Sequence, residues 1–83
     1  MPHDLSPSAL KLLRAIADHD TGHGVAFHRE PCARWRLAGT FYTVNNRTFG
    51  PLVDLGLVDV GNGQTDPVTL TAAGRDDLAS RAR

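Results

Sequence analysis

Two stretches near the end of the chain decide the fold, Phe49-Gly-Pro-Leu-Val-Asp-Leu-Gly-Leu-Val58 and Val68-Thr-Leu-Thr-Ala-Ala-Gly-Arg-Asp-Asp-Leu78. The apolar spacing of the first predicts a helix, and Gly56 stands where a glycine commonly ends one. The Leu-Val run after that glycine, the polar turn segment 61–67 and the Val-Thr-Leu run predict a hairpin. Thr71 can cap a last helix. This order of elements predicts a small α+β domain.

The chain also begins with a predicted helix. Ser6 can cap it, and Pro7 takes the first helical position, where the missing N–H costs nothing. Apolar residues then recur at helical spacing, and we expect the helix to end at about 18–20, before Gly22 and Gly24.

The segment over 25–39 admits two interpretations. Residues 25–28 resemble a short strand, after which Pro31 interrupts the chain. Apolar and arginine side chains then alternate, which favours a second strand with its arginines outward and its tryptophan in the core: Ala33, Arg34, Trp35, Arg36 and Leu37. The alternative is a short helix over 32–38, the first helix of a helix-turn-helix. The expected layout is therefore helix, hairpin or short helix, helix, two-stranded wing and C-terminal helix.

The helix near 45–55 contains an awkward dipeptide, Gly50-Pro51. Three residues before it are candidate caps: Asn45, Asn46 and Thr48. Because proline is tolerated only in the first turn of a helix, we expect regular helix to start at Thr48.

Size and composition bound the function. Eighty-three residues make one domain over 1–83, and 41% hydrophobic residues suit a globular chain. No apolar run is long enough to span a membrane, and the N-terminus shows no secretion signal. Cys32 is the single cysteine, so a reducing cytoplasm is the expected compartment.

The charge is balanced overall but unevenly distributed. Residues 28–49 hold four arginines against one glutamate, a net charge of +3, whereas residues 1–27 carry −1 and residues 50–83 carry −2. A local basic patch can attract phosphate even on a neutral protein. The alternative is that the four arginines simply solvate a surface.

The segment from about residue 45 to residue 78 resembles winged-helix transcriptional regulators, including the multiple-antibiotic-resistance-regulator group. The resemblance is carried by the Gly-Leu-Val that follows the helix and by the Leu-Thr-x-x-Gly-Arg that begins the next helix. Departures from the pattern are a wing without lysine or arginine and a glycine-proline pair in the helix that would read DNA.

The resemblance implies a homodimeric regulator that binds double-stranded DNA. It implies major-groove contacts from the start of the helix and wing contacts to the backbone or minor groove. The DNA-binding residues that the resemblance implies are Thr43, Asn45, Asn46 and Arg47 at the groove, and Asn62 and Gln64 on the wing. The basic segment 28–49 adds expected phosphate contacts from its arginines, Arg29, Arg34, Arg36 and Arg47. The alternative for the two asparagines is that they only cap and turn the chain.

The sequence also offers functions other than DNA binding. The neutral charge suits a winged-helix adaptor for a protein partner, with a surface on Trp35, Phe41 or Tyr42. Four zinc-type ligands lie close in sequence, at His19, His23, His28 and Cys32, but glycines interrupt them and their spacing matches no metal signature. The same cysteine and histidines could pair as nucleophile and base, yet nothing supplies an oxyanion hole. We therefore expect neither metal nor cofactor, and no enzyme activity.

Overall fold

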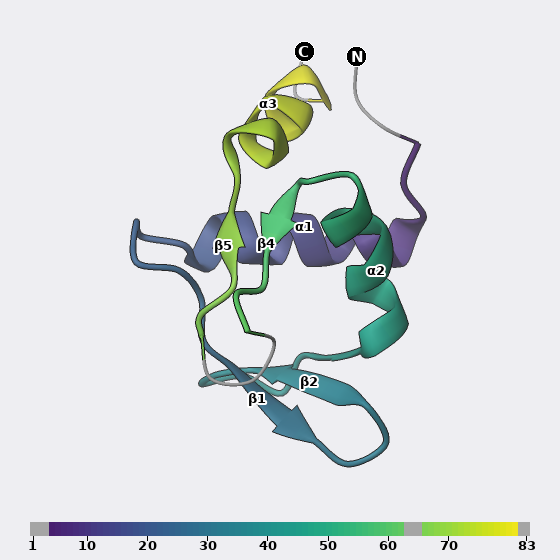
Figure 1. Ribbon diagram of the computed structural model, residues 1–83, viewed down its shortest axis with the longest axis vertical. Helices are drawn as coiled ribbons and strands as arrows, with labels where there is room; N and C mark the ends of the chain where they lie inside the picture. The colour runs from purple at the N-terminus through teal and green to yellow at the C-terminus, as the bar shows by residue number, and fades with distance from the viewer. Residues whose placement is uncertain (1–3, 63–65, 82–83) are drawn as a thin grey trace.

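A computed structural model describes residues 4–62 and 66–81 of the chain. The described residues form an α+β domain, which confirms the predicted class (Figure 1). The elements follow in the order α1 (Pro7–His19), β1 (Phe27–Glu30), β2 (Arg34–Leu37), β3 (Thr43–Asn45), α2 (Asn46–Asp54), β4 (Val58–Asp59), β5 (Thr69–Leu70) and α3 (Ala72–Arg81). This order is compatible with a winged-helix-like layout.

The strands form two separate sheets. Strands β1, β2 and β3 pair antiparallel in that order, and β4 pairs antiparallel with β5. A single bridge between Val25 and Val68 connects the segment before β1 to the second hairpin. Figure 1 shows the first sheet and α3 at opposite ends of the molecule, with α1 crossing between them.

The expected hairpin over 25–38 is confirmed, and the short-helix alternative is wrong. The first strand begins at Phe27, two residues later than expected, and Trp35 is buried as predicted. The predicted layout contains no third strand in this sheet, so β3 is an addition to it. It forms because Val44 lies opposite Trp35 in the register and shares its buried side of the sheet.

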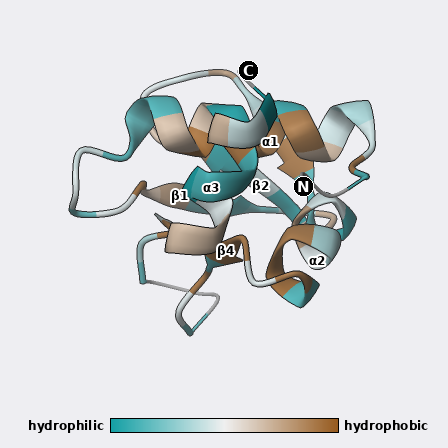
Figure 2. Cartoon of the chain, turned by 90° about the horizontal axis from the view of Figure 1, so that it is seen from above, coloured by the Kyte–Doolittle hydropathy of each residue, from teal (hydrophilic) through white to brown (hydrophobic). Residues whose placement is uncertain are grey.

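The core is built around one face of α1. Leu12, Leu13 and Ile16 are wholly buried, at a spacing that places them on one side of the helix. Figure 2 shows the hydrophobic and hydrophilic residues mixed along α1, as expected of a helix with one face in the core and one in solvent. The predicted cap is confirmed, because the Ser6 hydroxyl accepts from the Ala9 N–H at 3.2 Å.

Three aromatic rings join the first sheet to α2. The Trp35 ring lies 4.4 Å from that of Phe49, centroid to centroid. Phe27 contacts both edge-on, with its centroid 5.4 Å from Phe49 and 6.2 Å from Trp35. Such pairs add about 0.5–1.5 kcal/mol each to the free energy of burial.

The predicted start of α2 at Thr48 is wrong, because the helix begins two residues earlier. The Asn45 side chain caps it by accepting from the Arg47 N–H at 3.0 Å. Pro51 therefore lies in the helix interior and not in the opening turn. Pro51 has no N–H, so the helix lacks the backbone bond that another residue would donate there, and Pro51 itself is exposed.

Gly56 ends α2 as predicted. It adopts a φ of +72°, and its N–H donates to the Val53 carbonyl at 3.0 Å. The Leu57 N–H donates to the Leu52 carbonyl at 2.8 Å, which completes the paired bonds of a glycine-terminated helix. Both leucines are fully buried, so this turn sends the chain straight into the core.

Thr71 and Gly74 fix the position of α3. The Thr71 hydroxyl accepts from the Gly74 N–H at 3.0 Å, which confirms the predicted cap, and donates to the Gly56 carbonyl at 2.6 Å. Gly74 is buried, and a Cβ there would overlap the Leu57 carbonyl oxygen and meet the Leu70 side chain at 2.7 Å. The glycine of the Leu-Thr-x-x-Gly-Arg motif thus permits backbone contact between α3 and the second hairpin.

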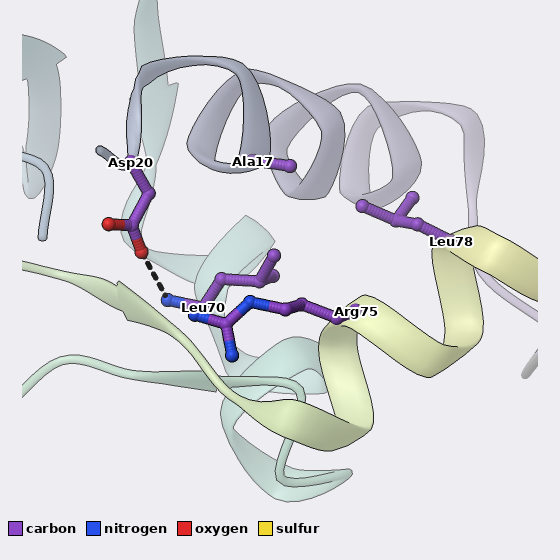
Figure 3. Close-up of a pocket in the computed structure, with 5 residues that line it drawn as sticks. All are labelled: Ala17, Asp20, Leu70, Arg75 and Leu78. Carbon is purple, nitrogen blue, oxygen red and sulfur yellow. Dashed lines mark hydrogen bonds between the residues drawn. The ribbon is translucent and has the colours of Figure 1, made fainter. Parts of the chain in front are cut away.

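Asp20 ties the end of α1 to the second hairpin. Its carboxylate accepts from the N–H groups of Gly22 at 2.9 Å and Gly24 at 3.1 Å, and from that of Leu70 at 3.2 Å. Figure 3 shows the bond to Leu70 and the Arg75 side chain reaching toward the same place from α3. The bond from Gly22 is the largest cause that lowers the pKa of Asp20, followed by the bond from Leu70.

Replacing Gly74 by alanine tests the close approach of α3. In an exposed helix this change stabilises by up to about 1 kcal/mol, but here the added methyl group has no room. We expect Gly74→Ala to lower the free energy of unfolding by about 1–3 kcal/mol. Urea unfolding measures this change in the free energy of unfolding. The control is Ala79→Gly at an exposed position of α3, which shows the effect of helix propensity without the close packing. Stabilisation by Gly74→Ala would refute the packing described.

Asp20 makes the stability depend on pH. Because its pKa lies below the usual 3.8 in the folded chain, its contribution is complete above that pH and is lost as pH falls through the folded pKa. We expect Asp20→Asn to lower the free energy of unfolding by about 1–2 kcal/mol at neutral pH. The difference from wild type should shrink in acid, whereas Asp18→Asn, at an exposed position on α1, should change little. Equal effects of the two variants would contradict this role.

Candidate nucleic-acid interface

The outer face of the first sheet collects polar side chains. The register pairs Arg36 with His28 and with Thr43, and pairs Arg34 with Asn45 and with Glu30. Since paired residues share a face and alternate residues along a strand do too, all six side chains lie on the side away from Trp35. Four of the expected DNA-binding residues are therefore neighbours: Arg34, Arg36, Thr43 and Asn45.

The two arginines of this outer face differ in their freedom. Arg34, Thr43 and Asn45 are exposed. Arg36 is half-buried, its guanidinium lies 3.5 Å from the Glu30 carboxylate, and it donates to the Thr40 carbonyl at 3.2 Å. The guanidinium of Arg36 is thus held in place, and Glu30 offsets part of its charge.

Arg29 lies on the other face of the sheet. It is opposite Trp35 in the register, and its guanidinium carbon stands 4.1 Å from the centre of the Trp35 ring. The contact is of the cation–π type and covers the buried ring. The sequence predicts phosphate contacts from Arg29, Arg34 and Arg36 together, but the sheet separates Arg29 from the other two.

The start of α2 continues the outer face without a break, because β3 ends where α2 begins. Arg47 is exposed in the first turn, next to the capping Asn45. Asn46 has a structural partner, since its side-chain oxygen accepts from the Trp35 indole N–H at 3.1 Å. The side-chain oxygens of Asn45 and Asn46 are thus engaged in the cap and in the bond to Trp35, while both residues remain exposed, as Arg47 does.

A polar cleft adjoins the outer face on the α1 side. It has a volume of about 290 Å³ and combines side chains of α1, β3 and α2: Ser8, Lys11, Tyr42, Thr43, Val44, Asn45 and Thr48. The Lys11 ammonium stands 5.4 Å from the centre of the Tyr42 ring. Burial raises the pKa of Tyr42, whose hydroxyl is in any case protonated at neutral pH and can donate.

Lys11, Ser8 and Thr48 were not among the expected site residues. The helical pattern of α1 does not indicate which strand its polar side meets. Only the packing of α1 against α2 brings Lys11 beside Thr43 and Asn45. One ammonium and four hydroxyls in one cleft are groups that bind phosphate oxygens.

The second hairpin uses its polar side chains to close its own turn. The Asn62 side chain accepts from the Asp66 N–H at 3.1 Å, and the Asp66 carboxylate accepts from the Asn62 N–H at 3.1 Å. The Asp59 carboxylate accepts from the Gly61 N–H at 2.8 Å. The side-chain oxygen of Asn62 is therefore engaged within the turn, beside two carboxylates. Gln64 lies outside the described residues.

The histidines and the cysteine occupy separate elements. His19 ends α1, with its ring nitrogen 2.9 Å from the Ala15 carbonyl, and His28 lies in β1. Cys32 is exposed in the β1–β2 turn with a φ of 65°. Within residues 4–62 and 66–81, no three His, Cys, Asp or Glu side chains stand where they could share a metal ion.

A second pocket lies between α1 and α3, away from the sheet (Figure 3). It has a volume of about 290 Å³, and its charged residues are Asp20 and Arg75. Asp20 is already bonded to the backbone there, so this pocket is part of the junction between α1 and the second hairpin.

Comparison with protein families, with curated proteins and with solved structures found no match for this chain. Among the described residues, no helix has the length and apolar character needed to cross a membrane. The outer face, the first turn of α2 and the adjoining cleft are therefore the basis for a functional proposal.

Proposed function

We propose that this chain is a DNA-binding regulatory protein of winged-helix type that acts in the cytoplasm on double-stranded DNA. One observation carries the proposal: three exposed polar residues of one sheet face, Arg34, Thr43 and Asn45, run directly into exposed Arg47 at the start of α2. Guanidinium, hydroxyl and amide groups are the side chains that contact phosphate and base edges.

The distribution of charge supports this orientation. Residues 28–49, which build the first sheet and the start of α2, carry a net charge of +3 on a chain of zero net charge. The sheet and α3 lie at opposite ends of the molecule (Figure 1), and the charges of α3 balance, since Arg75 and Arg81 match its two aspartates. Such an asymmetry turns the basic end toward a polyanion.

Contacts from α2 are confined to its first turn. Past Arg47 the exposed residues of the helix are Pro51, Val53 and Asp54, which offer no donors to a base edge. Base contacts would therefore come from Arg47 and from side chains of the sheet.

The cleft supplies a second set of phosphate contacts. Lys11 reaches the cleft from α1, so contacts to the DNA phosphates would extend from Arg34 on the sheet to the N-terminal helix. The proposed DNA-binding surface does not include the β4–β5 hairpin. The charged residues that the structure describes there are Asp59 and Asp66, which would repel phosphate.

A winged-helix adaptor that binds a protein is the second candidate. The observation in its favour is exposed apolar surface: Phe41 is 99% exposed, and Val53 and Leu55 are each 40% exposed. An adaptor of this kind would show no salt-dependent affinity for DNA.

Substituting the exposed arginines tests the DNA-binding proposal. We expect Arg34→Ala and Arg47→Ala each to weaken binding to a labelled mixed-sequence duplex and to reduce the slope of log affinity against log salt by about 0.9. Fluorescence anisotropy across a salt series measures both. Arg14→Ala is the matched control, because it removes the same charge from the exposed side of α1.

Equal losses for all three variants would show that only net charge matters and would refute the assigned surface. Absence of binding by the wild-type chain even at low salt would favour the adaptor.

A further inference from the structure

The β2–β3 turn presents a phenylalanine to solvent. Phe41 is 99% exposed, more than any other large apolar side chain among the described residues. Burying such a side chain is worth about 1.5–3 kcal/mol, so its full exposure forgoes that stabilisation. A single exposed apolar residue is common on protein surfaces, so a role for this ring depends on what surrounds it.

Hydrogen bonds fix the backbone on both sides of Phe41. The Leu37 carbonyl accepts from the Thr40 N–H at 3.1 Å and from the Thr40 hydroxyl at 2.9 Å. The Tyr42 N–H donates to the Thr40 hydroxyl at 3.1 Å, and the Tyr42 carbonyl accepts from the Leu37 N–H at 3.0 Å. Gly39 supplies a φ of +79° that most residues avoid. The turn thus holds the ring outward.

Cations flank the turn at its base. Arg36 donates to the Thr40 carbonyl at 3.2 Å, and Lys11 lies over the ring of Tyr42. The nearby carboxylate, Glu30, is paired with Arg36 at 3.5 Å. Phe41 lies two residues before Thr43, the first residue of β3, and both are exposed, so the phenyl ring lies next to the outer face in the chain.

An outward apolar ring on a fixed turn, with a cation on each side, fits a stacked base step between two phosphate strands. We propose that Phe41 inserts between adjacent base pairs of duplex DNA and bends the duplex, while Arg36 and Lys11 contact the flanking phosphates. The inference rests on the proposed function, and it adds a deformation of the DNA to the contacts of the outer face.

The test compares binding and bending in the same samples. A short mixed-sequence duplex carries a donor dye at one end and an acceptor dye at the other, and energy transfer reports the bend while anisotropy reports binding. We expect wild-type protein to raise the energy transfer. Phe41→Ala should abolish this rise and weaken binding about tenfold, with the salt slope unchanged. Phe41→Leu keeps an apolar wedge and should retain most of the bend.

The outcomes separate the two proposals. Salt-dependent binding without a bend, or a bend that Phe41→Ala retains, overturns the inference and leaves the DNA-binding proposal standing. Absence of wild-type binding overturns both proposals. Thermal unfolding checks the variants, since substitution of a side chain that is 99% exposed should leave stability unchanged.

Discussion

The packing of Trp35 against Phe49 is the contact on which the rest of the arrangement depends. Trp35 is 5% exposed, with the ring of Phe49 at 4.4 Å, the Arg29 guanidinium over its face and its indole N–H bonded to Asn46. Because side chains alternate along a strand, an inward Trp35 sends both flanking arginines outward, and a slip of one residue would bury two charges instead. The register of the sheet is therefore set by the core.

The same contact places α2 relative to the sheet. Asn46 is the first residue of α2, so its bond to the indole fixes where the helix begins, and its N–H donates to the Ala33 carbonyl at 2.8 Å in the turn between the first two strands. Strand β3 then runs into α2 with no loop between them. This continuity makes the outer face and Arg47 one surface, and the proposed DNA contacts follow from it.

Local chemistry made much of the fold predictable. Ser6, Gly56 and Thr71 act through bonds to backbone groups close in sequence, and the alternation around Trp35 predicted its strand. Pairings between distant segments were not predictable in the same way. Strand β3 forms because Val44 pairs with Trp35 in the register. Pro51 lies in the interior of α2 because the cap at Asn45 starts the helix two residues before the predicted position.

The candidate site was predictable only in part. Arg34, Arg36, Thr43, Asn45 and Arg47 form one surface, whereas register alone moves Arg29 to the opposite face and packing of α1 alone brings Lys11 to the cleft.

The most direct test of the central claim is the map of amide chemical-shift changes when a mixed-sequence duplex is added to isotope-labelled protein. The account predicts that the changes fall on β2, β3 and the first turn of α2, including Arg34, Thr43 and Arg47. Changes confined to α1 and α3 would contradict it, as would a spectrum that the duplex leaves unaltered.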